Sequence, residues 1–168
     1  MTTTSSEFDA KREQGMKHKD AALREYYNAL LFLRGLNNDV MATVVPKDPE
    51  NLEEGDITEL NKDLSVIQAN MAACHVRLNR STRAVQCAQD ALKSNPFNKK
   101  AKFRLVQGYI REGSLTKAEK LLDELEKDSP NDAAFAAERR NIATKEAEAE
   151  KKQRRELAGM FDRARNDD

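Results

Sequence analysis

The sequence contains few residues that bind metals or form covalent crosslinks. It has two cysteines, Cys74 and Cys87, and two histidines, His18 and His75, in 168 residues. The cysteines lie in mostly apolar helical stretches, and no spacing among these four residues matches a zinc site. We therefore expect free thiols that are buried in the core, with no disulfide and no bound metal.

The sequence also lacks the signals of most enzymes and membrane proteins. It has no glycine-rich phosphate loop and no nucleophile elbow, and no alternating apolar pattern predicts a strand. No apolar run approaches the roughly 18 residues needed to span a bilayer, and the N-terminus has no secretory signal pattern. We therefore expect a cytoplasmic protein without enzymatic activity, cofactor or membrane insertion.

Net charge is absent as well, since 29 basic residues balance 29 acidic residues. A neutral chain has no overall field that would attract nucleic acid, so a charged partner must be bound by a local patch. Tryptophan is missing, and only 6 glycines and 4 prolines occur, whereas 39% of the residues are hydrophobic and 35% are charged. This composition predicts an all-α protein.

The main feature that is present is a repeated pattern in the middle of the chain. Residues 70–98 and 104–132 align at an offset of 34 residues, so that Ala84 corresponds to Ala118. Each copy has an apolar first helix, a polar turn, a small residue where the helices cross, and a proline that ends the second helix. An offset of this length is typical of helix-turn-helix repeats.

These copies resemble the tetratricopeptide repeat. Small residues, one aromatic residue and the terminal prolines stand where that family has them: Ala72, Ala84, Ala91, Ala118, Tyr109, Pro96 and Pro130. One departure is Val106, where the family prefers a small residue, and we expect the packing at this crossing, near Gly108, to differ. The Lys/Arg-rich tail resembles that of large immunophilins and of the tetratricopeptide repeat protein 9 family, and the long loop after the first repeat resembles the second of these.

The resemblance implies an all-α solenoid of about three helix pairs, with a C-terminal capping helix that extends into a charged tail. Repeat arrays need such a cap because the last repeat otherwise exposes its apolar side, and Phe135, Ala136 and Ile142 are expected to supply it. The predicted boundaries are a repeat domain at 1–142 and a charged helical extension at 143–168. Within the domain we expect repeat 1 at about 6–36, a long loop at 37–58, repeat 2 at about 59–98, repeat 3 at 99–132 and the cap at 132–142.

Three arrangements are compatible with residues 6–36. If Gly15 lies where two helices cross, the segment is about five residues too short for a helix pair. If Gly15 lies in the turn, the second helix fits, but the first has almost no apolar face. The third arrangement is one long helix, since the segment has no proline. A single helix would leave a gap that a second copy of the protein could fill, so a homo-oligomer through the first helix is also expected.

The resemblance also implies a binding site for peptides. Some tetratricopeptide repeat proteins bind the C-terminal EEVD of heat-shock chaperones with five side chains that hold the terminal carboxylates. Asn70 on the third expected helix and Lys100 and Arg104 on the fifth stand at three of these positions. Residues four apart share one helix face, so Lys100 and Arg104 can converge on one anion while Asn70 donates from its amide.

The match is incomplete in the first repeat. With Gly15 at the crossing, Arg12 corresponds to the clamp lysine, and Met16 replaces an asparagine and cannot donate a hydrogen bond. With Gly15 in the turn, Glu7 would take the lysine position and repel a carboxylate. We therefore expect a co-chaperone-like adaptor that binds an acidic C-terminal peptide through Asn70, Lys100, Arg104 and Arg12.

A second partner surface is expected near the C-terminus. Leu157, Met160 and Phe161 recur at helical spacing among basic residues and form a short amphipathic stripe. Such a stripe can bind a protein groove or a membrane surface, and it can also pack on the repeats or on a second copy. The alternative function is therefore a scaffold or homo-oligomer with a partner other than a chaperone.

Overall fold

The computed structural model describes residues 3–38 and 53–166, and the burial of residues 13–33, 35 and 53–158. These residues form helices and no strands, which confirms the all-α fold class. The elements are α1 (Thr3–Asn38), the 3-10 helix η2 (Glu54–Asp56), α2 (Glu59–Arg77), α3 (Ser81–Ser94), α4 (Lys99–Glu112), α5 (Leu115–Asp128) and α6 (Ala133–Asn166).

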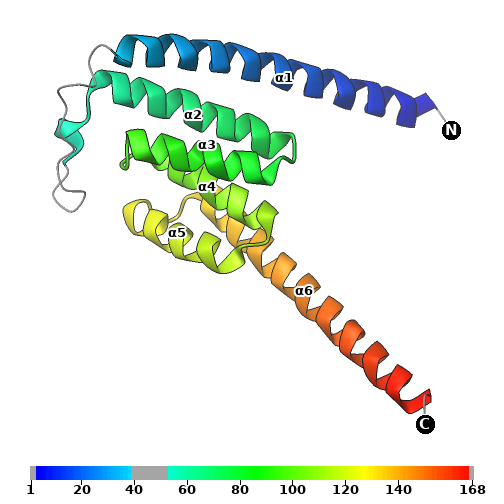
Figure 1. Cartoon of the computed structure of the whole chain (residues 1–168). Coiled ribbons are helices and arrows are strands. Elements are labelled where there is room, and N and C mark those ends of the chain that lie inside the picture. Colours follow the sequence, from blue (N-terminus) through cyan, green and yellow to red (C-terminus); the bar gives the residue numbers. More distant parts are fainter. Residues whose placement is uncertain (1–2, 39–52, 167–168) are drawn as a thin grey trace.

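The helices are stacked in the order of the sequence. Figure 1 shows α1, α2 and α3 side by side, α4 and α5 below them, and α6 projecting away from the stack. Helices α2 and α3 form one pair and α4 and α5 form the next, each joined by a tight turn. Asn79 and Gly113 adopt the left-handed conformation in these turns, with φ of 58° and 90°. The predicted turns of both copies are therefore confirmed.

The helix pair that was considered for repeat 1 is a single helix. Residues 6–36 lie within α1, which is the third of the three arrangements. Its C-terminal half packs on α2 through a core that contains Leu30, Leu64 and Met71. Helix α1 runs antiparallel to α2, and Asp20 forms an ion pair with Arg80, just after the end of α2. The part of α1 before Asp20 therefore extends past the repeats.

Small residues let the helices of the stack approach closely. Ala72, Ala84, Ala91 and Ala118 are fully buried, as the resemblance implied. The departure at Val106 is accommodated, because this side chain is itself fully buried in the core between α4, α5 and α6. The close approach to α3 takes place at Gly108 instead.

Side chains cap the helices and join neighbouring repeats. Thr58 Oγ1 accepts a hydrogen bond from the Asn61 nitrogen (3.2 Å), and Asp132 Oδ1 accepts one from the Ala134 nitrogen (2.8 Å). Threonine and aspartate are among the residues that helix N-caps prefer. Asn98 caps α4 and also donates to the buried Ser65 Oγ of α2 at 2.8 Å. This hydrogen bond fixes the start of α4 beside α2.

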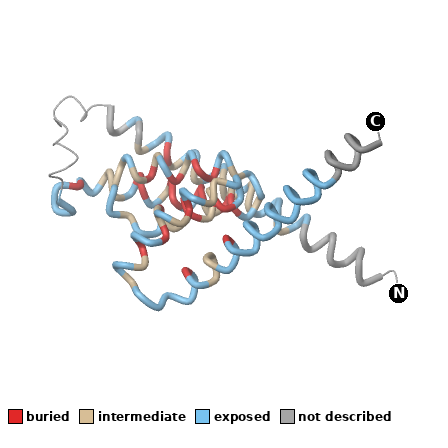
Figure 2. The backbone as a smooth tube through the Cα atoms, turned by 90° about the horizontal axis from the view of Figure 1, so that it is seen from below, coloured by how far each residue is buried: buried red, intermediate tan, exposed pale blue. Residues whose placement is uncertain are grey.

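The first turns of α6 close the stack, and the rest of the helix does not. Phe135 and Ile142 are buried, whereas Ala136 is exposed and does not contribute to the cap. After Ile142, all described residues up to Ala158 are exposed, as Figure 2 shows along the distal part of the helix. Among the described residues, no helix combines the length and the apolar character needed to cross a membrane. The division at residue 142 stays a prediction, since α6 continues through it.

Candidate functional site

The exposed face of α2 is a narrow stripe. Three helices, α1, α3 and α4, pack against α2, so most of its surface is buried. The exposed residues recur at helical spacing and are Glu59, Asp63, Val66, Asn70 and Arg77. Val66 is 52% exposed, so the stripe offers an apolar contact beside polar groups.

Two hydrogen bonds establish how α4 lies beside this stripe. Asn98 donates to Ser65 near the start of both helices, and Arg111 Nη1 donates to Asn79 Oδ1 (3.4 Å) near their ends. These partners are 33 and 32 residues apart in sequence. The two helices therefore run parallel, and a residue of α2 is level with the residue of α4 about 33 positions later. Asn70 is then about level with Phe103, one residue before Arg104.

Three of the predicted site residues come from these two adjacent helices. Asn70 is exposed on α2, Lys100 is exposed on α4, and Arg104 is half-buried one helical turn after Lys100. Among the described residues, neither Asn70 nor Lys100 forms a hydrogen bond or ion pair, so their donors are open to solvent. That these three residues bind a peptide stays a prediction.

Arg104 lies in a polar network that joins α4 to α6. Its Nη1 donates to Gln107 Oε1 at 2.8 Å, and Gln107 Nε2 donates to Glu138 Oε1 at 2.7 Å. The guanidinium carbon is 5.7 Å from the centroid of the Phe103 ring. Burial lowers the pKa of Arg104, the positive charge of Arg77 lowers it further, and the carboxylate of Glu138 opposes both effects. Gln107 and Phe103 thus hold Arg104 in position, and Glu138 balances only part of its positive charge.

Sequence reasoning missed two residues beside Arg104. Arg77 follows Asn70 by seven residues and therefore lies on the same face of α2, which the helical period alone could have indicated. Glu138 could not have been found in this way, because its place beside Gln107 depends on how α6 returns to α4.

Nearby, a hollow of about 360 Å³ lies between α4 and α6. Its lining residues are Gln107, Ile110, Arg111, Glu138, Asn141, Thr144, Lys145 and Glu148.

The remaining predicted residues are not brought to these helices. The side chains of Arg12, Met160 and Phe161 lie outside the described residues. The backbone of Arg12 belongs to α1, eight residues before Asp20, which is about 12 Å farther past the end of α2. Leu157 is 46% exposed on the distal part of α6, so the stripe of Leu157, Met160 and Phe161 stays a prediction.

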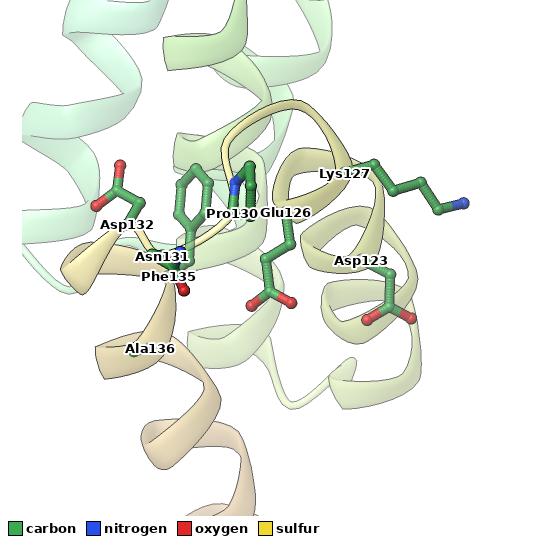
Figure 3. Close-up of a pocket in the computed structure, with 8 residues that line it drawn as sticks. All are labelled: Asp123, Glu126, Lys127, Pro130, Asn131, Asp132, Phe135 and Ala136. Carbon is green, nitrogen blue, oxygen red and sulfur yellow. The ribbon is translucent and has the colours of Figure 1, made fainter.

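A larger hollow of about 540 Å³ lies on another part of the surface, between the end of α5 and the start of α6. Figure 3 shows its lining, which includes Asp123, Glu126 and Phe135 but none of the predicted site residues. Both carboxylates pair with Arg139, and the Glu126 contact measures 2.8 Å. We interpret this network as the connection that holds α6 on α5.

The two cysteines lie within the packed repeat. Cys74 is buried and Cys87 is half-buried, and both thiols are free. Burial raises the pKa of both thiols, which disfavours the reactive thiolate. The prediction of free thiols in the core is confirmed for Cys74 and holds in part for Cys87.

Comparison with known proteins agrees with this architecture. Residues 82–142 match the sequence model of the tetratricopeptide repeat. Among solved structures, the chain is similar to the Hsp90 co-chaperone Cns1 from Saccharomyces cerevisiae (delta69), with a TM-score of 0.52 and 19% identity. The match covers 90% of this chain and 46% of that one, so this chain spans about half of the compared structure. At this identity the similarity shows the fold alone.

Proposed function

This chain contains a tetratricopeptide repeat domain, and we propose that this domain is a co-chaperone-like adaptor that binds an acidic C-terminal peptide of the EEVD type. The observation that carries the proposal is the placement of Asn70, Lys100 and Arg104 on level stretches of two adjacent parallel helices. The similarity to a structure described as an Hsp90 co-chaperone supports the same class of partner. A partner of this class would place the protein in the cytoplasm.

The three side chains would divide the peptide's carboxylates between them. Lys100 and Arg104 would pair with the terminal carboxylate and with the side chain of the final aspartate, and Asn70 would donate to the terminal carboxylate. Val66, one turn before Asn70, would contact an apolar residue of the peptide. Because these contacts are charge-assisted and open to solvent, added salt should weaken binding.

The test is a fluorescence titration with the peptide MEEVD and with the same peptide amidated at its C-terminus. We expect a dissociation constant in the micromolar range, which corresponds to a binding free energy on the order of −8 kcal/mol. The amidated peptide should bind at least about tenfold more weakly, because amidation removes one charged hydrogen-bond acceptor. Equal binding of the two peptides, or no binding of either, would contradict the carboxylate clamp.

Self-association through α1 is a second candidate function. Tyr27 and Leu31, one turn apart, are 53% and 51% exposed on a flank of α1, beside the face that packs on α2. Pairing this stripe with α1 of a second copy in antiparallel orientation would repeat each contact across a two-fold axis, as a symmetric dimer requires. A homodimer would cover apolar surface that the single chain leaves in water.

Light scattering tests this second candidate. The wild-type protein should have the mass of a dimer, and the double variant Tyr27→Lys/Leu31→Lys should have the mass of a monomer. Phe32→Lys is the matched control, since Phe32 is 69% exposed but lies on a different side of α1 and should leave the dimer intact. A monomeric wild-type protein would overturn the pairing.

A further inference from the structure

His75 lies where α1 meets the end of α2. It belongs to the last turn of α2, four residues after Met71, and therefore lies on the same side of α2 as the core that packs against α1. Its backbone oxygen accepts a hydrogen bond from the Arg80 nitrogen (2.9 Å), and Arg80 Nη1 pairs with Asp20 of α1 (2.9 Å). His75 is thus placed beside the ion pair that joins α1 to the turn after α2.

The imidazole of His75 has a buried nitrogen that lacks a partner. Its Nδ1 is buried and forms no hydrogen bond with any residue that the structure describes. A neutral imidazole carries one hydrogen and can hold it on Nε2, whereas a protonated imidazole carries a hydrogen on both nitrogens. The hydrogen on Nδ1 would then be a buried donor without an acceptor, which is costly. The packed structure therefore favours the neutral ring.

The charges around the imidazole also disfavour its protonated form. Burial lowers the pKa of His75 most, and the positive charges of Arg80 and of Arg83 on α3 lower it further. Asp20 of α1 raises the pKa but has the smallest of these effects, and its carboxylate is already paired with Arg80. Lys19 of α1, whose charge reaches the neighbouring thiol of α2, is also positive. The C-terminal end of a helix favours a positive charge, but here the two arginines oppose it.

We propose that His75 is a pH-sensitive contact between α1 and the repeats, and that a second proton on its imidazole loosens the packing of α1 on α2. If α1 separates from α2, the imidazole reaches water and its pKa returns to the ordinary value of 6.5. The separated state then binds the proton more tightly than the packed state does. The packing is therefore at full strength above about pH 6.5 and weakens as the pH falls below that value.

Amide hydrogen exchange at about pH 7.5 and 5.5, read by mass spectrometry, tests this proposal without relying on peptide binding or self-association. Each rate is divided by the intrinsic exchange rate at the same pH, so that the ratio reports local opening. The proteins are wild type, His75→Gln and His18→Gln. Glutamine is polar and stays neutral at both pH values. His18 is an exposed histidine of α1, so its replacement controls for the loss of a histidine.

Two segments report the outcome. Residues 22–33 of α1 pack on α2, whereas the contacts of α5 among the described residues are with α4 and α6. In wild type and His18→Gln, protection of residues 22–33 should fall several-fold at the lower pH, with about tenfold as the limit for one proton. His75→Gln should lose less than about twofold, and α5 should keep its protection in all three proteins. An equal loss in His75→Gln and wild type, or in α1 and α5, would overturn the proposal.

Arg83→Gln provides a second test that leaves His75 and the pair of Arg80 with Asp20 in place. Arg83 is exposed on α3, and its removal takes away one positive charge that acts on the imidazole. The loss of protection at the lower pH should therefore be about half as large as in wild type or smaller. Lys93→Gln, at the other end of α3, removes the same charge and should retain the wild-type loss. A wild-type loss in Arg83→Gln would contradict the role of His75, even if His75→Gln did not fold.

Discussion

Replacing Arg104 by methionine should weaken binding of the MEEVD peptide by about 30-fold. Arg104 is half-buried, Gln107 orients its guanidinium, and it lies level with Asn70, so it is the most fixed cation of the proposed clamp. Removing a hydrogen bond to a charged group costs about 2 kcal/mol, which corresponds to this loss. The affinity is measured by fluorescence titration, as for the wild type.

The control for Arg104 is Lys102→Met on the same helix. Lys102 lies on another side of α4 and has no ion pair among the described residues, so its replacement changes the net charge equally. It should leave the affinity within about twofold, because surface charges away from a site act weakly. Methionine at residue 104 retains an apolar stem over Phe103, and a thermal melt would show that the fold is kept. Equal losses in the two variants would mean that Arg104 contributes only general positive charge.

The second large effect is expected on stability, from Gly108→Ala. A Cβ atom at residue 108 would lie 2.8 Å from Val85 Cγ2 and 3.3 Å from the Val85 backbone nitrogen. Valine is restricted at χ1 in a helix, and Val85 is buried, so the side chain cannot rotate away and α3 must shift. Overpacking of this kind costs about 1 to 3 kcal/mol, which exceeds the helix preference of alanine over glycine.

Gly15→Ala provides the matched control for this prediction. Gly15 lies inside α1, and a Cβ atom there would meet nothing within 4 Å. The same substitution should therefore raise stability, by up to about 1 kcal/mol, since alanine favours the helix. Both variants are compared with wild type by urea unfolding. A Gly108→Ala protein as stable as Gly15→Ala would show that the α3–α4 contact is looser than the structure indicates.

The elements that could be predicted from sequence are those governed by local rules. The polar turns, which contain Asn79 and Gly113, and the buried alanines depend on residues within one repeat. The offset of 34 residues then places equivalent residues of the two copies at equivalent positions. For this reason Asn70, Lys100 and Arg104 could be assigned to adjacent helices before the structure was considered.

Tertiary packing decided the features that involve distant parts of the chain. Whether residues 6–36 fold back or continue as one helix depends on how much apolar surface the first turns can bury, and the local pattern left this open. The choice of Gly108 as the point of close approach depends on Val85 of another helix. Glu138 joins the network of Arg104 only because α6 returns to α4.

The sequence alone thus determined the helical class, the two central repeats and three side chains of the candidate site, because helix periodicity and repeat length are encoded in neighbouring residues. The structure alone decided that the first repeat is one helix, that Arg77 has no ionic partner among the described residues and lies near enough to influence Arg104, and that α6 contributes an acid to the groove. These features arise from contacts between residues far apart in sequence, and their geometry is set only when the helices pack.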